Sequence, residues 1–446
     1  MPVCMLDPEA EINKRIEASA EMLSQYFSIQ FEFEQCYLDG KPNITLQALV
    51  EIADKKLKRV AVGIAQNDSS EPVDGASFEA LASKFEWPII DCNQPVALEP
   101  IAIAKPWGQE LWYTGIEKRG QSFVGDGVYS TPLPWLLAIA PLAFTSQKHP
   151  KLNLLKILDP LPEPVFGDLY FELHAEKQEV YVVTHVDESA WPSGAGKIKI
   201  GFDQAERDKL QPDEKFVEAF NDAVKNYELV RRTIDAKLDE CRQKEGVALD
   251  EPVSAGRTKS WLQTVEPELI DRELHLREQM DRFKGEVSLK VGDVLKVPCF
   301  TPHSLMHGVR TIEFQTPVYE RQILSFAQKV LTQDHWDTES ASQNMSLEGF
   351  SLEEFLSIDL GVGATKETVV NFSDFQVERV TLQPGSEVQL HSGDQYALVI
   401  GVKGGVELNG KALGAEKAVL IPAISDAIIA RNTSSTASVF LLSKPH

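Results

Sequence analysis

The protein has 446 residues, which is long enough for two or three domains, and 43% of them are hydrophobic and 25% charged. Its formal net charge of −23 at pH 7 repels phosphate backbones and anionic membrane surfaces, so we expect neither nucleic acid nor a membrane as a partner. No stretch approaches the run of about 20 apolar residues that spans a bilayer, and the composition is typical of a soluble globular protein.

The cysteines and the N-terminal residues indicate a reducing compartment. The sequence has five cysteines, an odd number, and none of them forms a C-x-x-C pair. They are scattered along the chain at Cys4, Cys36, Cys92, Cys241 and Cys299. This pattern favours reduced thiols over a disulfide framework or a cysteine zinc site. The first residues lack the apolar core of a secretory signal, so we expect a cytoplasmic protein.

The first hundred residues predict mixed α/β structure. Apolar residues recur with nearly helical spacing over residues 8–27, and again over residues 45–57 after a capping candidate at Asn43 or Thr45. Between these two segments, residues 28–38 alternate like a strand. We therefore interpret residues 1–100 as an α/β extension at the N-terminus.

From about residue 105 the pattern changes to short strand-like runs separated by glycine and proline, which is typical of antiparallel β-domains. A helical stretch then interrupts the strands. Apolar residues at every third or fourth position predict a long helix over residues 213–241, and we expect a second helix over residues 266–283. The charged residues on the other faces of these helices are interpreted as solvated.

Strands return after the helices. The pattern of residues 286–321 predicts strands. A polar stretch follows at residues 332–346, and another all-β run begins near residue 369. The two β-regions share an order of strand, glycine turn and strand. We therefore predict a mainly β fold in which two related β-domains occur and the first is interrupted by a helical insert.

A crowded stretch in the first β-region is the best candidate for chemistry. In "FELHAEKQEV", Glu172 and His174 are two residues apart, so in a strand they point to the same face. A tight hairpin would bring Glu179 back beside His174, and the later segment "VPCFTPH" presents His303 after a proline turn. Two glutamates and two histidines that converge inside a barrel would form a metal site with nitrogen and oxygen ligands. Taken alone, however, an E-x-H pair is also common on a solvent-facing strand.

The first of these segments resembles the first motif of the cupin superfamily, which runs from a glycine through His-x-His to a glutamate. This chain has Gly167, four residues, Glu172-x-His174, four residues and Glu179. The first histidine of the motif is therefore replaced by a glutamate.

The second segment resembles the second cupin motif, which runs from a glycine through Pro-x-Gly to a histidine. This chain has Gly292, five residues, Pro298-x-Phe300, two residues and His303. Phe300 stands where the motif has a glycine. The resemblance implies two cupin domains, each a jelly-roll β-barrel.

Within the cupins, the chain is more closely similar to type I mannose-6-phosphate isomerase. That family has a Lys-x-Glu, a "VPxGTPHA" segment, and an "LEIQ" followed by an arginine. Here Lys177-x-Glu179, "VPCFTPHS" and "IEFQTPVYER" occupy these places, and the last of them supplies Glu313 and Arg321. The family also has a helical insert between the motifs, and "KPWGQELW" is similar to its early "WG" segment.

The resemblance implies the following division of the chain. After the α/β extension at residues 1–100, residues 101–202 together with 285–330 would form the metal-binding cupin domain. Residues 203–284 would form the helical insert, and residues 345–446 a degenerate C-terminal cupin domain. In the latter, His391 stands near a first-motif position but Asp426 replaces the second-motif histidine, so we expect no metal there.

The resemblance also implies one divalent metal ion held by Glu172, His174, Glu179 and His303. Zinc is the first expectation because the family uses it. Glu172 replaces a neutral glutamine of the family, however, and a second carboxylate favours harder ions, so Mn²⁺ and Fe²⁺ are alternatives.

The implied reaction is an aldose–ketose isomerisation of a small phosphorylated sugar through a cis-enediol. Lys177 and Arg321 would stabilise the enediolate or hold the phosphate, and Glu313 would be an acid/base candidate. Two alternatives remain open. His174, His303 and one carboxylate could form the Fe²⁺ triad of a cupin oxygenase, or the protein could bind a sugar without catalysis.

Overall fold

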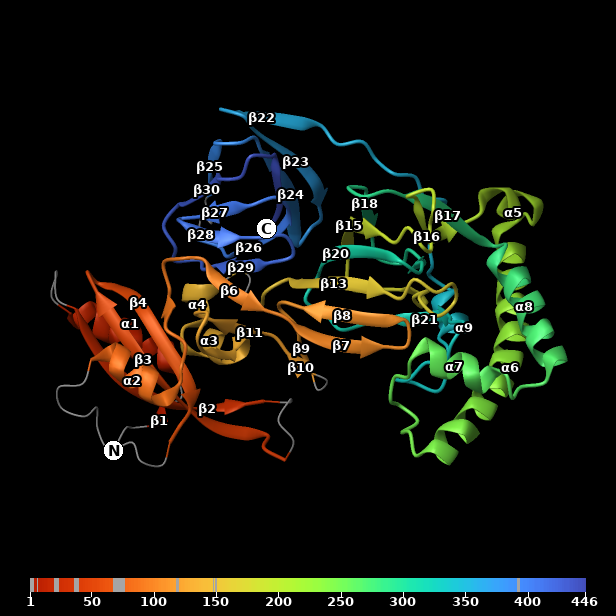
Figure 1. Ribbon diagram of the computed structural model, residues 1–446, viewed down its shortest axis with the longest axis horizontal. Coiled ribbons are helices and arrows are strands. Elements are labelled where there is room, and N and C mark those ends of the chain that lie inside the picture. Colours follow the sequence, from red (N-terminus) through yellow and green to blue (C-terminus); the bar gives the residue numbers. More distant parts are fainter. Residues whose placement is uncertain are drawn as a thin grey trace. The chain divides into compact units, whose positions relative to one another are not determined.

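The computed structural model describes residues 4–5, 7–19, 24–35, 40–66, 77–117, 120–146, 148, 151–390 and 394–446, and the chain is mainly β (Figure 1). It forms two compact units. The first unit comprises Met1–Ile101, Trp112–Lys156 and Phe355–His446, and the second comprises Ala102–Leu111 and Ile157–Glu354. Within the described part of the chain, none of the helices combines the length and apolar character that a membrane-spanning helix requires.

A five-stranded sheet in the order β1-β2-β3-β4-β5 begins the first unit. Its strands are β1 (Cys4–Met5), β2 (Gln25–Glu34), β3 (Asn43–Ala53), β4 (Lys56–Ile64) and β5 (Ile90–Asp91). Two of its helices are α1 (Pro8–Ala18) and α2 (Phe78–Phe85). The expected strand at residues 28–38 is confirmed as β2 up to Glu34, and residues 36–38 lie outside the described residues. The helix expected at 8–27 is shorter, because β2 already begins at Gln25.

The helix expected over residues 45–57 is wrong, because this segment forms β3 and the start of β4. Strand β3 is central in the sheet and is buried on both faces: Leu46 and Ala48 are fully buried on one face, and Leu49 packs with Ala61 and Phe78 on the other. A strand that is covered on both faces has a continuous apolar run, which spacing alone does not distinguish from a helix.

Two further sheets in the first unit pack around a common apolar core. The larger has nine strands in the order β12-β11-β6-β29-β26-β31-β24-β23-β22. These strands are β12 (Ser130–Pro132), β11 (Phe123–Gly125), β6 (Val96–Glu99), β29 (Ala418–Ile421), β26 (Ala397–Lys403), β31 (Ser438–Pro445), β24 (Phe375–Leu382), β23 (Ala364–Asn371) and β22 (Ser357–Gly361). The smaller consists of β25 (Glu387–Leu390), β30 (Ile428–Asn432), β27 (Val406–Leu408) and β28 (Lys411–Leu413).

The larger sheet joins distant parts of the sequence. Leu98 in β6 pairs with Ala418 in β29, and β11 and β12 extend the sheet beyond β6. Residues 123–132, which the sequence analysis assigned to the metal-binding domain, therefore belong to the same sheet as strands of the C-terminal region, to which β6 connects them. The unit is completed by α3 (Leu133–Ile139), α4 (Pro141–Phe144) and the short pair β9 (Ile116–Glu117) and β10 (Gly120–Gln121).

The second unit contains two sheets that enclose an apolar core. One sheet has the order β18-β15-β20-β13-β8-β7 and the other the order β17-β16-β19-β14-β21. The strands of the first are β18 (Val294–Val297), β15 (Glu179–Val186), β20 (Val309–Gln315), β13 (Leu154–Pro160), β8 (Gly108–Trp112) and β7 (Ile101–Lys105). Those of the second are β17 (Lys284–Leu289), β16 (Gly196–Phe202), β19 (His303–Leu305), β14 (Phe171–Leu173) and β21 (Gln322–Ser325).

A helical segment lies between β16 and β17 and packs on this unit (Figure 1). It consists of α5 (Gln204–Lys209), α6 (Asp213–Glu245), α7 (Ala255–Leu262) and α8 (Pro267–Asp281), and a further short helix is α9 (Thr338–Ala341). The helices expected at residues 213–241 and 266–283 are confirmed as α6 and α8. Helix α6 ends at Glu245 and is capped by Gly246, which adopts the left-handed conformation with φ of 68° that favours glycine.

Helix α6 is attached to the β-sheets by a cluster of phenylalanines. Phe216 and Phe220 are fully buried, and their rings meet the ring of Phe202 edge-to-face at centroid distances of 5.3 and 5.1 Å. Phe220 also meets Phe171 of β14 at 6.5 Å. Such aromatic contacts add to the stabilisation from buried area. The cluster therefore connects the helical segment to the strand that carries Glu172.

We expect Phe220→Ala to destabilise the protein by about 3–5 kcal/mol, because it removes a buried ring and leaves a cavity. Urea unfolding followed by circular dichroism measures this change. The matched control is Leu229→Ala on the same helix, where the side chain is 65% exposed and the expected change is within about 0.5 kcal/mol. Equal effects of the two substitutions would show that the cluster does not hold the helix.

Candidate metal centre

Two neighbouring strands bring Glu172 and His303 together. Glu172 in β14 lies directly opposite His303, the first residue of β19, in an antiparallel pair. Residues that lie directly opposite each other in such a pair point to the same face of the sheet. His174 follows the end of β14, and its ring lies 5.3 Å from the ring of His303 between centroids.

Glu179 approaches the same group from the other sheet. It is the first residue of β15, and its carboxylate is buried. Glu179 Oε1 lies 3.5 Å from His174 Nε2, and Glu179 Oε2 lies 3.3 Å from His303 Nε2. One carboxylate therefore contacts both imidazoles and connects the two sheets at this point.

Three of the four expected ligands form a compact set. One ligand atom from each of Glu172, His174 and His303 lies within 4.8 Å of the other two. Glu172 Oε1 is 4.0 Å from His174 Nε2. Glu179 is not part of this set of three, but it contacts both of its histidines.

The ring of His174 is oriented by the backbone. Its Nδ1 donates a hydrogen bond to the carbonyl oxygen of Glu320 at 2.9 Å, so the proton of the neutral ring is on Nδ1. Its Nε2 is buried and has no hydrogen-bond partner among the described residues. Burial, reinforced by the nearby charge of Lys177, holds the pKa of His174 well below its ordinary value. His174 is therefore neutral and presents a free lone pair to the centre.

The ring of His303 is oriented in the same way, through Nδ1 and the carbonyl oxygen of Thr301 at 3.0 Å. Burial disfavours its charged form, but the hydrogen bond and the charge of Glu179 outweigh burial and raise the pKa of His303. Because Nδ1 donates to this carbonyl, Nε2 is the atom that would bind a second proton. A bound metal ion would take the place of that proton.

The carboxylate of Glu179 is stabilised by a lysine and a tyrosine. Lys177 Nζ lies 2.8 Å from Glu179 Oε1, and the hydroxyl of Tyr181 donates to Glu179 Oε2 at 2.6 Å. Burial alone would raise the pKa of Glu179, but the charge of Lys177 and the hydrogen bond with His303 hold its pKa well below its ordinary value. The carboxylate is therefore ionised although it is buried.

Arg321 lies at the edge of the group. Its Nη1 is 3.9 Å from Glu172 Oε2, and its Nη2 donates to Thr332 Oγ1 at 2.6 Å. The guanidinium also stacks over the ring of Tyr170, 4.7 Å from the centroid. Arg321 thus contacts three neighbours, one of which is the candidate ligand Glu172.

Glu313, the third residue with an expected catalytic role, is buried in β20. It lies directly opposite Tyr181 of β15, so the two side chains share a face with Glu179, two residues before Tyr181. Burial and the charges of Glu179 and Glu313 raise the pKa of Tyr181 well above its ordinary value. Tyr181 therefore remains a protonated donor between these carboxylates.

The loops that carry the two motifs are tied together. The backbone N–H of Phe300 donates to the carbonyl oxygen of His174 at 2.7 Å. Phe300 has a φ of 65°, in the left-handed region that favours glycine. Phe300 stands at the position where the resembling motif has a glycine.

The residues fit a divalent cation. The buried Nε2 of His174 and the buried Oε2 of Glu172 each lack a hydrogen-bond partner among the described residues, and both belong to the set of three. Buried polar atoms without partners are uncommon and costly, and a bound ion would satisfy them. Neutral imidazoles with the second nitrogen bonded to a carbonyl are also the usual form of metal ligands.

Two residues of the centre were missed by the sequence analysis. Tyr181 links Glu179 to His303, whose Nε2 lies 3.1 Å from its hydroxyl. Its position two residues after Glu179 on one strand was the signal that could have found it. Glu320 holds His174 through its carbonyl and accepts hydrogen bonds from Ala175 and Glu176 through its carboxylate. No sequence signal indicates the carbonyl contact, because every residue has a carbonyl.

The fold and the group of histidine and glutamate side chains define a mainly β protein with a candidate metal centre. No known protein family matches the chain by sequence, and no curated protein matches it. Solved structures do match. The mannose 6-phosphate isomerase of Bacillus subtilis is 13% identical, with a TM-score of 0.54 over 78% of this chain and 99% of that one.

Two further structures are similar to the chain. A zinc-bound mannose 6-phosphate isomerase is 14% identical, with a TM-score of 0.51 over 79% of this chain and 99% of that one. A variant of the phosphomannose isomerase of Salmonella typhimurium has the same identity, TM-score and coverage. At this identity the likeness establishes the fold. The resemblance to mannose-6-phosphate isomerase that the motifs indicated is thus confirmed for the fold.

The ionised Glu179 should make stability depend on pH. Because its pKa is lowered in the folded state from the ordinary 4.5, its contribution is fully present above that value and is lost as the pH falls towards the folded value. In chelator-treated protein, we expect Glu179→Gln to cost about 3–5 kcal/mol at pH 7, because it leaves Lys177 buried without its partner. Below about pH 4.5 the difference in free energy of unfolding between the wild type and the variant should decrease by up to about 1.4 kcal/mol per pH unit.

Urea unfolding of both proteins between about pH 7 and 3.5 measures this difference. Glu176→Gln is the matched control, because its side chain is exposed in the same loop. If the difference in free energy of unfolding between the wild type and Glu179→Gln does not change with pH, the carboxylate at this position is not ionised.

Proposed function

We propose that the protein is a metal-dependent aldose–ketose isomerase that acts on a small phosphorylated sugar, similar to mannose 6-phosphate isomerase. One observation carries the proposal. A group of two histidines and two glutamates suited to a divalent ion has a cation beside each of its carboxylates, Lys177 at Glu179 and Arg321 at Glu172. The fold shared with sugar-phosphate isomerases supports the same reaction class.

Glu172, His174 and His303 would hold the ion, with Glu179 as the fourth ligand. When bound, a divalent ion supplies Lewis-acid polarisation of the sugar oxygens. Zinc is supported by the zinc-bound isomerase of the same fold. Two carboxylates in the ligand set also suit Mn²⁺ or Fe²⁺, so we propose one divalent ion per chain with zinc as the first candidate.

Isomerisation through a cis-enediol moves a proton between two neighbouring carbons and leaves negative charge on the enediol oxygens. Lys177 and Arg321 would stabilise this charge, since a fixed cation in a buried site costs no reorganisation when the charge develops. Arg321 would also attract the phosphate in a chain whose net charge of −23 otherwise repels anions. Glu313 would transfer the proton, with the hydroxyl of Tyr181 directly across the strand pair.

A second candidate function is an Fe²⁺ oxygenase of the cupin type. It is favoured by the composition of the compact set, which has two histidines and one carboxylate, the ligands of non-haem Fe²⁺ oxygenases. This reaction has no need of Lys177 and Arg321 beside the metal, whereas the isomerisation requires cations there. The isomerase is therefore the preferred proposal.

We expect protein purified without added metal to carry about one divalent ion per chain and to convert mannose 6-phosphate to fructose 6-phosphate. Elemental analysis and a coupled assay measure both. Chelation should abolish turnover and addition of the ion should restore it, and His174→Ala should lose the ion. His335→Ala is the control, because that histidine is 66% exposed.

The outcomes separate the candidates. Protein that binds no divalent ion would rule out both enzymes and leave a sugar-binding protein. A bound ion without turnover of any hexose or pentose phosphate would rule out the isomerase, and oxygen consumption with Fe²⁺ would then identify the oxygenase.

The role of Arg321 can be tested separately. We expect Arg321→Met to lower kcat/KM by about 10²–10³-fold, because a preorganised cation that faces the developing charge is lost, while the metal content stays unchanged. Steady-state kinetics and elemental analysis of the variant measure both values. Lys197→Met removes an exposed lysine that pairs with Glu286 and should leave both unchanged. Full activity of Arg321→Met would exclude a role of its charge in the reaction.

A further inference from the structure

Three buried polar side chains lie on one face of β20. Thr311, Glu313 and Gln315 alternate along the strand, so they point to the same side of the sheet. At most 2% of each of these residues is exposed to solvent. The proposed reaction gives a role to Glu313 but none to Thr311 or Gln315.

Gln315 lies beside the candidate metal centre. It is directly opposite Glu179 in the antiparallel pair of β15 and β20, so the two side chains share a face and their Cβ atoms are about 4.5–5.5 Å apart. The carboxylate of Glu179 lies 3.5 Å from His174 Nε2 and 3.3 Å from His303 Nε2. Gln315 is therefore the direct neighbour of a candidate ligand that contacts both candidate histidine ligands.

The side-chain amide of Gln315 has little hydrogen bonding. Its Oε1 is buried and has no hydrogen-bond partner among the described residues. Its Nε2 donates one long hydrogen bond, of 3.4 Å, to the carbonyl oxygen of Thr316. A buried amide oxygen without a partner is uncommon and costs free energy. Because Gln315 is next to a group of candidate metal ligands, a bound ion is the partner that its oxygen would find there.

An amide oxygen is a suitable ligand for a divalent ion. Side-chain and backbone carbonyl oxygens bind hard cations, and Mn²⁺ in particular favours oxygen ligands. The expected ligands are Glu172, His174, Glu179 and His303. An ion in an octahedral site takes about six ligands, so these four side chains leave room for another oxygen. A neutral amide also adds this oxygen without a third negative charge in the centre.

Thr311 provides a comparison on the same strand. Its Oγ1 is also buried and also has no hydrogen-bond partner among the described residues. It lies opposite Val183, however, and not opposite a candidate ligand. It is four residues before Gln315, which is about 13 Å along a strand. The two side chains thus share a strand, a face and an unsatisfied oxygen, and only Gln315 is next to the centre.

We propose that Gln315 is a further ligand of the candidate metal centre and that its Oε1 binds the same divalent ion as the four expected ligands. The ion satisfies the buried amide oxygen, and the amide adds an oxygen that favours the harder ions Mn²⁺ and Fe²⁺. The proposal rests on the divalent ion of the proposed function, but it does not depend on the isomerase reaction.

Co²⁺ added to chelator-treated, full-length protein is the probe, because its visible absorption reports both binding and coordination geometry. Gln315→Met keeps the length of the side chain and removes the oxygen. We expect this variant to bind Co²⁺ at least about tenfold more weakly and with a changed visible spectrum. Without the ion, it should melt about 2–4 °C higher than the wild type, because an unsatisfied buried amide is removed.

Thr311→Val is the matched control, because it removes the other unsatisfied oxygen from the same face of β20. It should also raise the melting temperature, but it should leave the affinity for Co²⁺ and the visible spectrum unchanged. Gln315→Glu provides a carboxylate oxygen at the same distance from the backbone. It should bind Co²⁺ at least as tightly as the wild type, with a changed spectrum.

The outcomes are separable. The proposal is overturned if Gln315→Met binds Co²⁺ like the wild type, or if Thr311→Val weakens binding to the same extent. If Gln315→Met does not fold, Gln315→Glu decides, and a visible spectrum identical to that of the wild type overturns the proposal. Wild-type protein that binds no Co²⁺ would overturn the metal centre of the proposed function together with this proposal.

Discussion

The buried carboxylate of Glu179 is the interaction on which the centre depends. An isolated ionised carboxylate in a protein interior is very costly, so it persists only with partners that stabilise its charge. Here Lys177 and Tyr181 contact it at 2.8 and 2.6 Å, and His174 and His303 approach it from the opposite sheet. Because these partners come from both sheets, the ionised carboxylate connects the two sheets at the place where the candidate ligands meet.

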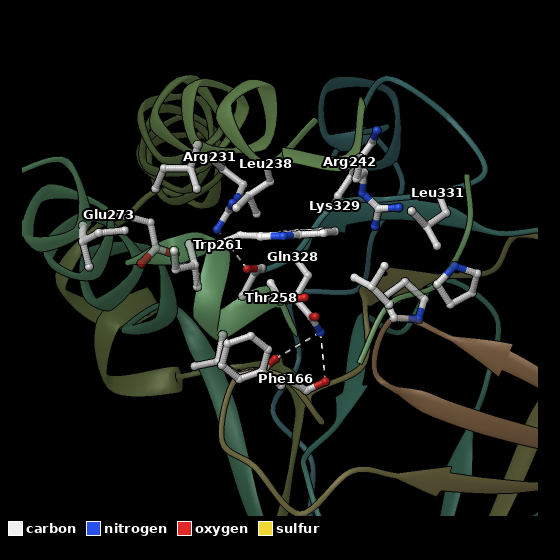
Figure 2. Close-up of a pocket in the computed structure, with 18 of the residues that line it drawn as sticks. Phe166, Arg231, Leu238, Arg242, Thr258, Trp261, Glu273, Gln328, Lys329 and Leu331 are labelled. Carbon is white, nitrogen blue, oxygen red and sulfur yellow. Dashed lines mark hydrogen bonds between the residues drawn. The ribbon is translucent and has the colours of Figure 1, made fainter. Parts of the chain in front are cut away.

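The helical segment has a structural role in the same unit. Phe220 of α6 packs against Phe202 and against Phe171, the residue before Glu172, so the helix supports the strand that carries the first candidate ligand. Further towards its C-terminal end, α6 contributes Arg231 and Arg242 to the wall of a cavity that α7 and α8 also line (Figure 2). One long helix thus supports a polar centre through apolar contacts, and two of its buried arginines line a cavity.

The sequence predicted the type of an element correctly where one face of the element is exposed, as in α6, and wrongly where both faces are buried, as in β3. Helix α6 has a clear apolar stripe and was predicted, whereas β3 is covered on both faces and was mistaken for a helix. The spacing of Glu172, His174, Glu179 and His303 predicted that these residues would meet, and the structure brings them together. The backbone contacts that orient the two histidines were not predictable, because a carbonyl acceptor is present at every residue and depends on tertiary packing.

Glu172 stands where the family that the sequence resembles, type I mannose-6-phosphate isomerase, has a glutamine. This difference changes the charge balance at the centre. In a centre without a cation, the extra negative charge of Glu172 is compensated mainly by Arg321, at 3.9 Å, since its Oε2 makes no hydrogen bond with the described residues. A divalent ion bound by Glu172 would take over this compensation. With the ion bound, the charge of Arg321 would then be available to an anionic ligand. If the residue at position 172 were a glutamine, the charge of Arg321 would be available both with and without the ion. The extra carboxylate therefore makes substrate attraction by Arg321 depend on the metal ion, within the proposed function.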